Sequence, residues 1–371
     1  VLAASAARTD AKMDYDIVAR IRHAGRVVEL DKPRPILVTD LDEPALKMRC
    51  GKRDDPLRMP SCDRLVELAT TPQAKADMLI LRSQARPYDA QIADLDLAVA
   101  AAPDYLTATI ARARGHLADY RYDADLRPYE PDWADADSAV SRAPAGSDEL
   151  KAALLTRATA SHGKGNYEAA IVDLSRLLEL DASAAYLVEM RGEALLMAGR
   201  PAPALVDLRE TRRLVADDRR KFLQDDDFVV ALIETGNVGE ALAELEAWKR
   251  DGVGGDIARE ALRARAVFAN GDAAEARAIA TAALGANRFN LGAIAIRGMA
   301  SASMGQPLDA VPDLTRAIDD AVAVPFKAAT TGMTPGHIAD LFLHRGLARL
   351  QLNQTNAARA DFGEAIRRAP D

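Results

Sequence analysis

The sequence predicts an all-α fold class, an α-α superhelix of about eight stacked helix-turn-helix units behind a non-repeat N-terminal extension. Three observations predict it: a step of 34 residues, a Gly or Asn at a constant place in each step, and small residues where the helices would cross. The composition fits, because 49% of the 371 residues are hydrophobic, 28% are charged and only 5% are aromatic. These fractions are those of an ordinary folded chain, outside the range of disordered ones.

The 34-residue step is clearest in residues 151–218. There Arg, Gly and Ala recur at equivalent places, which are Arg157 and Arg191, Gly165 and Gly199, and Ala170 and Ala204. The pattern continues to the last residue, so residues 151–371 hold six units, each of them a helix, a turn and a second helix. One helix pair cannot bury its apolar face alone, so the units must stack.

Two kinds of position explain how each unit is built. A Gly or Asn at the turn can adopt the left-handed conformation that ends the first helix. These turn residues are Gly165, Gly199, Gly236, Gly271, Gly305 and Asn353. Small residues then let the two helices cross closely, and they are Gly192, Gly298 and Gly346 on first helices and Ala170, Ala204, Ala241, Ala276, Ala310 and Ala358 on second helices.

This pattern resembles the tetratricopeptide repeat family, whose unit has 34 residues. Residues 165–170, Gly-Asn-Tyr-Glu-Ala-Ala, match the family's turn and second-helix start. The chain departs from the family in lacking the first-helix aromatic residue, and the Pro that closes a unit is clear only at Pro370. The resemblance implies a non-catalytic scaffold without a cofactor, which holds a protein or peptide in a concave groove lined by the first helices.

The domain organisation follows from where the step holds. Residues 149–371 are expected to form the repeat array, interrupted by an insertion at residues 321–337, and residues 61–148 to form two degenerate units. Residues 1–60 do not repeat.

Within the N-terminal extension, residues 10–24 are expected to form one amphipathic helix. The β-branched runs at residues 26–30 and 36–39 either pair with each other or lie in a Pro-rich extended loop.

Export to the periplasm or out of the cell is expected, with a cytoplasmic location as the alternative. Residues 1–7 match the end of a secretory signal peptide around Ala4-Ser-Ala6, or are a flexible end. Cys50 and Cys62 are expected to form a disulfide, or else are two unrelated thiols. Residues 61–68 also resemble a Cys-containing helix of exported bacterial repeat proteins.

The most specific polar signal is an Arg on a first helix followed 16 residues later by an Asp on the second. The pairs are Arg157 and Asp173, Arg191 and Asp207, Arg297 and Asp313, and Arg345 and Asp361. The planar guanidinium of Arg suits a bidentate carboxylate partner, so we interpret the pairs as structural links between helices. The alternative is a row of Arg side chains that binds an anionic ligand.

The resemblance also indicates which residues line the groove. These positions are Leu155, Thr159, Glu189, Glu193, Asp226, Val230, Ala261, Arg265, Ala295, Met299, Leu343 and Leu347. Family members that clamp a peptide's terminal carboxylate use Lys and Asn here, and both are absent. The row is acidic toward its middle and apolar toward its C-terminal end, so it suits a basic or apolar extended peptide or a partner helix.

Four further residues are candidate contacts. His162 and His344 fall on first helices and are polar groove residues or ligand contacts. Tyr129 and Trp133 lie in an aromatic and acidic stretch, which is either a binding surface or a loop that places Trp133 in the core.

Other function classes have little support. The His and Cys residues lack the spacing of metal ligands, and the catalytic and phosphate-binding motifs are missing, so no catalytic residue, metal or cofactor is expected. A net charge of −8 disfavours nucleic acid as a partner, and no apolar run has the length of a membrane span. The alternative to a scaffold is an enzymatic or small-ligand-binding subunit with a pocket between the N-terminal extension and the repeats.

Overall fold

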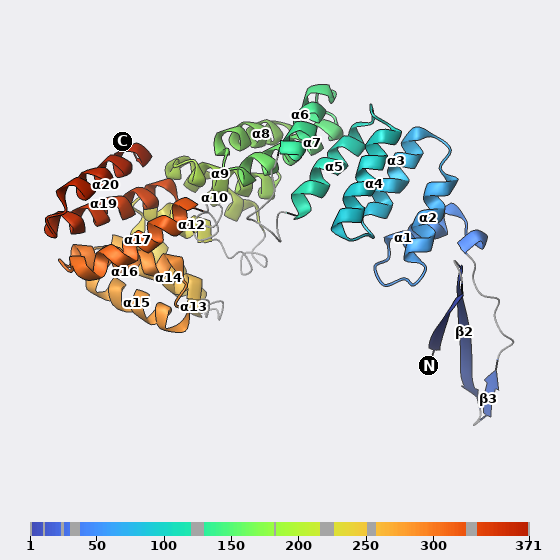
Figure 1. Ribbon diagram of the computed structural model, residues 1–371, viewed down its shortest axis with the longest axis horizontal. Coiled ribbons are helices and arrows are strands. Elements are labelled where there is room, and N and C mark those ends of the chain that lie inside the picture. Colours follow the sequence, from blue (N-terminus) through green and yellow to red (C-terminus); the bar gives the residue numbers. More distant parts are fainter. Residues whose placement is uncertain are drawn as a thin grey trace. The chain divides into compact units, whose positions relative to one another are not determined.

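The computed structural model describes residues 2–9, 12–23, 26–29, 38–119, 130–181, 183–215, 226–250, 257–323 and 332–369. The chain divides into two compact units, Val1–Asp119 and Tyr120–Asp371. Helices follow one another in chain order within each unit (Figure 1).

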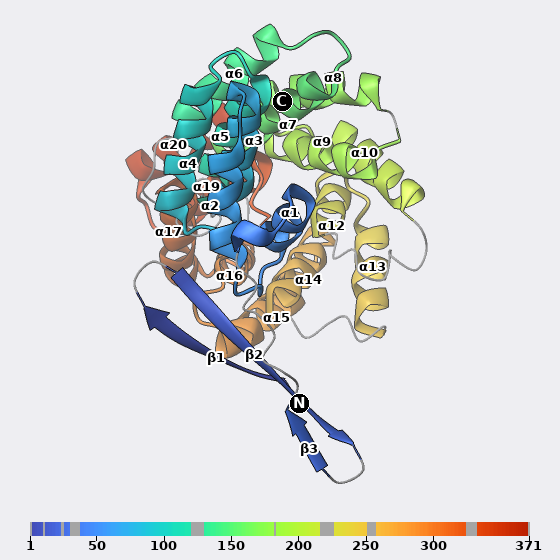
Figure 2. The ribbon, with the colours of Figure 1, turned by 90° about the vertical axis from the view of Figure 1, so that its right-hand side faces the viewer.

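Unit 1 begins with strands and continues with helices. Its elements are β1 (Leu2–Thr9), β2 (Lys12–His23), β3 (Arg26–Glu29), the short 3-10 helix η1 (Val38–Asp40), α1 (Glu43–Gly51), α2 (Arg58–Leu68), α3 (Pro72–Ser83), α4 (Tyr88–Ala101) and α5 (Leu106–Asp119). The strands are antiparallel in the order β1-β2-β3 (Figure 2). Helices α3 and α4 pack on each other within residues 61–148, where degenerate units were expected.

The amphipathic helix expected at residues 10–24 is wrong, because this stretch contains β2. Met13, Tyr15 and Ile17 alternate with Asp14 and Asp16, which is the period of a strand and not of a helix. Strands β1 and β3 hydrogen-bond to β2 and supply the pairing that an isolated strand lacks. The run at residues 26–30 therefore pairs with β2, and residues 30–37 lie outside the described residues.

Helices α1 and α2 enclose the two cysteines. Cys50 of α1 and Cys62 of α2 lie side by side with their Cα atoms 5.0 Å apart, within the range that a disulfide requires. Both are buried in a small core with Leu46 and Leu65. The two cysteines thus lie where α1 meets α2, at the start of the helical part of unit 1.

Unit 2 is entirely helical in its described part. Its helices are α6 (Glu130–Arg142), α7 (Asp148–Gly163), α8 (Tyr167–Leu180), α9 (Ala185–Met197), α10 (Pro201–Leu214), α12 (Asp226–Glu234), α13 (Val238–Arg250), α14 (Ile257–Ala269), α15 (Ala273–Ala286), α16 (Leu291–Ser303), α17 (Pro307–Ala323), α19 (Pro335–Gln351) and α20 (Thr355–Arg368). Each packs mainly on its neighbours in the chain, and α19 also packs on α16. The predicted α-helical solenoid is confirmed.

The turn and crossing residues behave as the sequence predicts. All six predicted turn residues have a positive φ, including Asn353 at 59°. A Cβ on Gly346 would lie 2.5 Å from Cε1 of Phe362, and one on Gly298 would lie 2.8 Å from Cγ of Leu314. These glycines are therefore required by the close crossing of the two helices of a unit.

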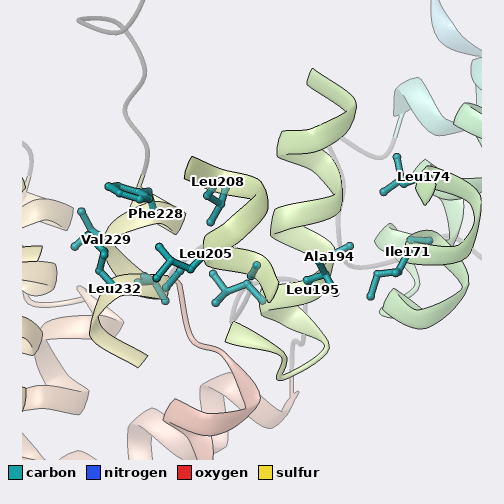
Figure 3. Packing of buried hydrophobic residues seen from close by; sticks show 14 of the residues in the cluster. Ile171, Leu174, Ala194, Leu195, Leu205, Leu208, Phe228, Val229 and Leu232 are labelled. Carbon is teal, nitrogen blue, oxygen red and sulfur yellow. The ribbon is translucent and has the colours of Figure 1, made fainter. Parts of the chain in front are cut away.

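The core of unit 2 runs from one helix pair into the next. Figure 3 shows Ile171 of α8, Leu195 of α9, Leu208 of α10 and Phe228 and Leu232 of α12 within one continuous cluster. Such nearest-neighbour packing is what a stacked repeat array requires. The expected domain boundaries at residues 60 and 148 stay a prediction, because the division into compact units falls elsewhere, after Asp119.

Candidate functional site

All four predicted Arg–Asp pairs come together in the structure, and each is bidentate. Arg157 donates from Nε and Nη2 to the two carboxylate oxygens of Asp173, at 2.8 and 2.6 Å. The same two-bond arrangement joins Arg191 to Asp207, Arg297 to Asp313 and Arg345 to Asp361. The hydrogen bonds to Asp173 are the largest cause that raises the pKa of Arg157.

Three of these Arg side chains also reach the preceding helix pair. Their additional acceptors are Asp137 of α6 for Arg157, Ser175 of α8 for Arg191 and Thr315 of α17 for Arg345. Each guanidinium thus links its own two helices and the helix before them. Because these contacts use the donors that an anionic ligand would need, the geometry favours the structural interpretation.

A fifth link of this kind escaped the sequence analysis. Arg82 of α3 donates to both carboxylate oxygens of Asp94 on α4, at 2.9 and 2.6 Å, and also to Asp63 of α2. Its partner lies 12 residues along the chain instead of 16, because the turn between α3 and α4 is shorter. The position of Arg82 on a first helix, equivalent to that of Arg157, was the sequence signal that could have predicted this link.

The predicted groove positions, which we call the first-helix row, fall into three parts. On α7 and α9 the row is accessible, and the side chain of Glu193 is 42% exposed. From Val230 on α12 to Met299 on α16 it is buried. On α19 it is exposed again, at 39% for Leu343 and 44% for Leu347.

Arg265 and Met299 are therefore wrong as accessible partner contacts. Arg265 is only 8% exposed, and Met299 lies 3% exposed in a core cluster with Met333. Both are covered within the protein, so a partner segment does not reach them in this conformation.

The buried part of the row contacts the chain's own residues 332–337, which we call the inserted segment. Arg265 donates from Nη1 to the carbonyl of Gly332 at 2.9 Å and from Nη2 to Glu234 of α12 at 2.6 Å. The hydroxyl of Thr334 also donates to Glu234. Thr334 and Met333 are 0% and 1% exposed.

The inserted segment reaches beyond α12. A Cβ on Gly332 would lie 3.2 Å from Cγ2 of Val230, and one on Gly199, at the turn between α9 and α10, would lie 3.8 Å from Pro335. The segment belongs to the expected insertion at 321–337, of which residues 324–331 lie outside the described residues. It occupies a face on which the sequence placed an external peptide.

The accessible part of the row carries a group of carboxylates, which we call the acidic surface: Glu189 and Glu193 of α9 with Asp226 and Asp227 of α12. Burial, and then the charges of Glu193, Asp226 and Glu189, raise the pKa of Asp227 to about 7. Burial and then Glu189 raise the pKa of Glu193, and burial raises that of Glu189. Within the described ranges, no Lys or Arg forms an ion pair with Glu189, Glu193 or Asp227.

His162 of α7 borders the acidic surface. Its Nε2 lies 3.5 Å from Oε1 of Glu193, and its ring meets the ring of Tyr167 edge to face at 5.2 Å. Burial lowers the pKa of His162. The imidazole is thus placed beside the carboxylates as a group that is largely neutral near pH 7.

Comparison with known proteins agrees with this geometry. A family model described as tetratricopeptide repeat matches residues 339–371, which contain α19 after its first turn and all of α20. Residues 339–371 thus match the tetratricopeptide repeat family.

Two solved structures are similar to this chain at low sequence identity. A Rap protein complexed with competence and sporulation factor is 12% identical, with a TM-score of 0.51, covering 83% of this chain and 98% of that one. A tetratricopeptide repeat protein from Parabacteroides merdae is 16% identical, with a TM-score of 0.49, covering 70% of this chain and 93% of that one. No curated protein matches the sequence.

Of the remaining candidate contacts, Trp133 lies on α6 and His344 on α19. Trp133 of α6 is half-buried, with Nζ of Lys164 6.0 Å from its ring centre, and Tyr129 lies outside the described residues. Nδ1 of His344 is 2.8 Å from the carbonyl oxygen of Asp340, and its ring packs against Phe268.

In the described ranges, no group of three His, Cys, Asp or Glu residues is arranged to hold a metal ion. None of the described helices is both long enough and apolar enough to span a membrane.

Proposed function

We propose that this protein is a non-catalytic scaffold that holds a partner protein by an extended segment carrying Lys or Arg side chains. The segment binds the acidic surface of α9 and α12, next to His162 of α7. One observation carries this proposal: Glu189, which is exposed, and Glu193 and Asp227, which are half-buried, gather without a described basic partner. Gathered carboxylates repel one another, and a bound cation would relieve that repulsion.

The fold supports a binding role. Stacked helix pairs present an extended surface on which a partner can lie, and the Rap protein was solved in complex with a factor. Because the row from Val230 to Met299 is buried within the protein, the binding segment is confined to the part formed by α7, α9 and the start of α12.

A peptide-binding measurement tests the proposal. The probe is a labelled nine-residue peptide of alternating Lys and Ser, followed by fluorescence anisotropy. Replacing both Glu193→Gln and Asp227→Asn is expected to lower its affinity about tenfold, because two anionic contacts are lost. Higher salt is expected to weaken binding to the unmodified protein.

The matched control removes the same charge elsewhere. Glu179 of α8 and Asp319 of α17 are exposed, so Glu179→Gln with Asp319→Asn is expected to leave the affinity unchanged. Equal affinities for the two double variants, or equal binding of a peptide with Glu in place of Lys, would refute the proposed function.

The proposal includes a location in the bacterial cell envelope, periplasmic or secreted. The adjacent, buried cysteines Cys50 and Cys62 support it, because disulfides persist in oxidising compartments. Alkylation of free thiols in the native cell extract, followed by mass spectrometry, is expected to leave both cysteines unlabelled. Two alkylated cysteines would remove this support. Where the bond is present, its loss in Cys50→Ser with Cys62→Ser is expected to cost roughly 3 kcal/mol of stability.

A further inference from the structure

The last helix pair carries an exposed apolar face. Leu343, Leu347 and Leu350 lie on one side of α19, at spacings of four and three residues, and are 39%, 44% and 49% exposed. Ile366 of α20 is 67% exposed. We call these four residues the α19–α20 apolar face.

The preceding pair, α16 and α17, shows what covers such a face. Arg297 is equivalent to Arg345, and Asp313 to Asp361, so the four apolar residues have counterparts in that pair. The counterparts are Ala295, Met299, Ala302 and Ile318, which are 0%, 3%, 6% and 4% exposed. They lie in one core cluster with Leu341 and Phe342 of α19, the helix that packs on both α16 and α17.

The same positions are thus closed in one unit by a packed helix and open in the next. The residues on α19 are also larger, Leu where α16 has Ala or Met. Scattered apolar residues on a surface need no explanation, whereas a set at positions that a helix covers elsewhere in the fold indicates a docking surface.

The border of the face indicates the charge of its occupant. Arg359 lies seven residues before Ile366 on α20, which places both on one side of that helix. Arg359 is exposed, and across the described part of the chain no acidic residue pairs with it. An acidic group on the occupant would complement this charge.

We propose that the α19–α20 apolar face docks an amphipathic helix of a partner protein, apolar on one side and acidic along its flank. This helix takes the place on α19 that α19 itself takes on α16. The site is separate from the acidic surface of α9 and α12, so the protein would hold partners at two places with opposite chemistry.

A designed peptide tests this directly with the full chain. The probe has the sequence of residues 335–351, stapled to hold a helix, with Leu343→Glu, Leu347→Glu and Leu350→Glu. It keeps Ile338, Leu341 and Phe342, which belong to or pack against the core shared with α16. Isothermal titration is expected to show saturable binding of one peptide per chain.

Variants of the protein locate the bound peptide. Leu347→Asp with Ile366→Asp is expected to weaken binding at least about tenfold, because each change places a charge in an apolar contact. Arg359→Glu is expected to weaken it by a smaller factor. All three positions are exposed in the free chain, so circular dichroism and thermal melting are expected to match those of the unmodified protein.

The control uses an equally exposed apolar pair on other helices. Val172 of α8 and Val206 of α10 are 65% and 67% exposed, and Val172→Asp with Val206→Asp is expected to keep the full affinity. Leu347→Asp with Ile366→Asp is also expected to bind the Lys-containing peptide normally, so a failure here is distinguishable from failure of the proposed function.

Three results would overturn the proposal. The first is absence of peptide binding to the unmodified protein. The second is equal affinity for the variants of the apolar face and for the control. The third is a dimer of the unmodified protein, seen by analytical ultracentrifugation, that Leu347→Asp dissociates, because a second copy would then cover the face.

Discussion

Two parts of the first-helix row differ although they occupy equivalent positions in the repeat. On α9, Glu189 and Glu193 are accessible and lie among other carboxylates, whereas Arg265 on α14 is buried in a hydrogen-bonded group with Glu234 and Gly332. The equivalent repeat position therefore does not decide whether a residue meets a partner. What lies across the position decides it, and here that is the protein's own inserted segment.

The two parts also differ in how their polar groups are satisfied. Arg265 donates to the carboxylate of Glu234 and to the carbonyl of Gly332, and burial strengthens these two interactions. Around Glu193 like charges face one another, so burial raises the pKa values of the carboxyl groups and weakens the fold. A surface that costs stability in the free protein is typical of a binding site.

The largest effect is expected in the buried part of the first-helix row around Arg265, which we call the closed part. Arg265→Ala leaves the carboxylate of Glu234 buried without its cation, because the two side chains are 9% and 11% exposed. We expect the free energy of unfolding to fall by about 3–5 kcal/mol, as measured by urea denaturation.

The control for this change is an ion pair of equal length on the surface. Arg209 and Glu240 are also 2.6 Å apart but 51% and 44% exposed, and Arg209→Ala is expected to cost about 0–1 kcal/mol. Similar losses in the free energy of unfolding for Arg265→Ala and Arg209→Ala would show that the inserted segment does not stabilise the closed part.

A smaller effect is expected where a structural link borders the acidic surface. Arg191→Ala removes both hydrogen bonds to Asp207, whose side chain is 9% exposed while that of Arg191 is 28% exposed. We expect a loss of about 2 kcal/mol in chemical denaturation, with the affinity for the Lys-containing peptide retained. An unchanged stability would contradict the structural interpretation of the Arg–Asp pairs.

A still smaller and opposite effect is expected from Asp227→Asn. The pKa of Asp227 rises from 3.8 to about 7 on folding, so the folded chain keeps a proton that the unfolded chain releases between these values. Stability therefore falls as the pH rises through this window. The variant is expected to be about 1–2 kcal/mol more stable than the unmodified protein at pH 8 and equal to it near pH 4. A constant difference at both pH values would contradict this assignment.

The contribution of the closed part to stability is expected to fall as the pH falls, which is opposite to the effect of Asp227. Burial, and then the positive charges of Arg265 and His344, lower the pKa of His337 well below its ordinary value of 6.5. Below pH 6.5 the unfolded chain gains a proton that the folded chain does not, so stability falls with falling pH. Between pH 6.5 and 5, the free energy of unfolding of His337→Gln is expected to fall by about 1 kcal/mol less than that of the unmodified protein. Denaturation curves measure this difference. Parallel pH profiles would exclude His337 as the cause.

The sequence predicted local features well and distant ones poorly. The turn residues such as Gly165, and the pairing of Arg157 with Asp173, follow from a short, constant spacing. Arg82 and Asp94 were missed because a shortened turn changes that spacing. The burial of Arg265 depends on a contact with Gly332, 67 residues away, and an insertion outside the repeat carries no periodic signal that predicts it.

The inserted segment also changes how the array is connected. In a stacked repeat chain each unit contacts only its neighbours, so the ends can unfold one unit at a time. The hydrogen bond from Thr334 to Glu234 joins residues 100 positions apart and ties the start of α19 to α12. This closes the linear array into a loop from α12 to α19. The helices in that loop are therefore expected to unfold together, as one cooperative block at the C-terminal side of an otherwise modular chain.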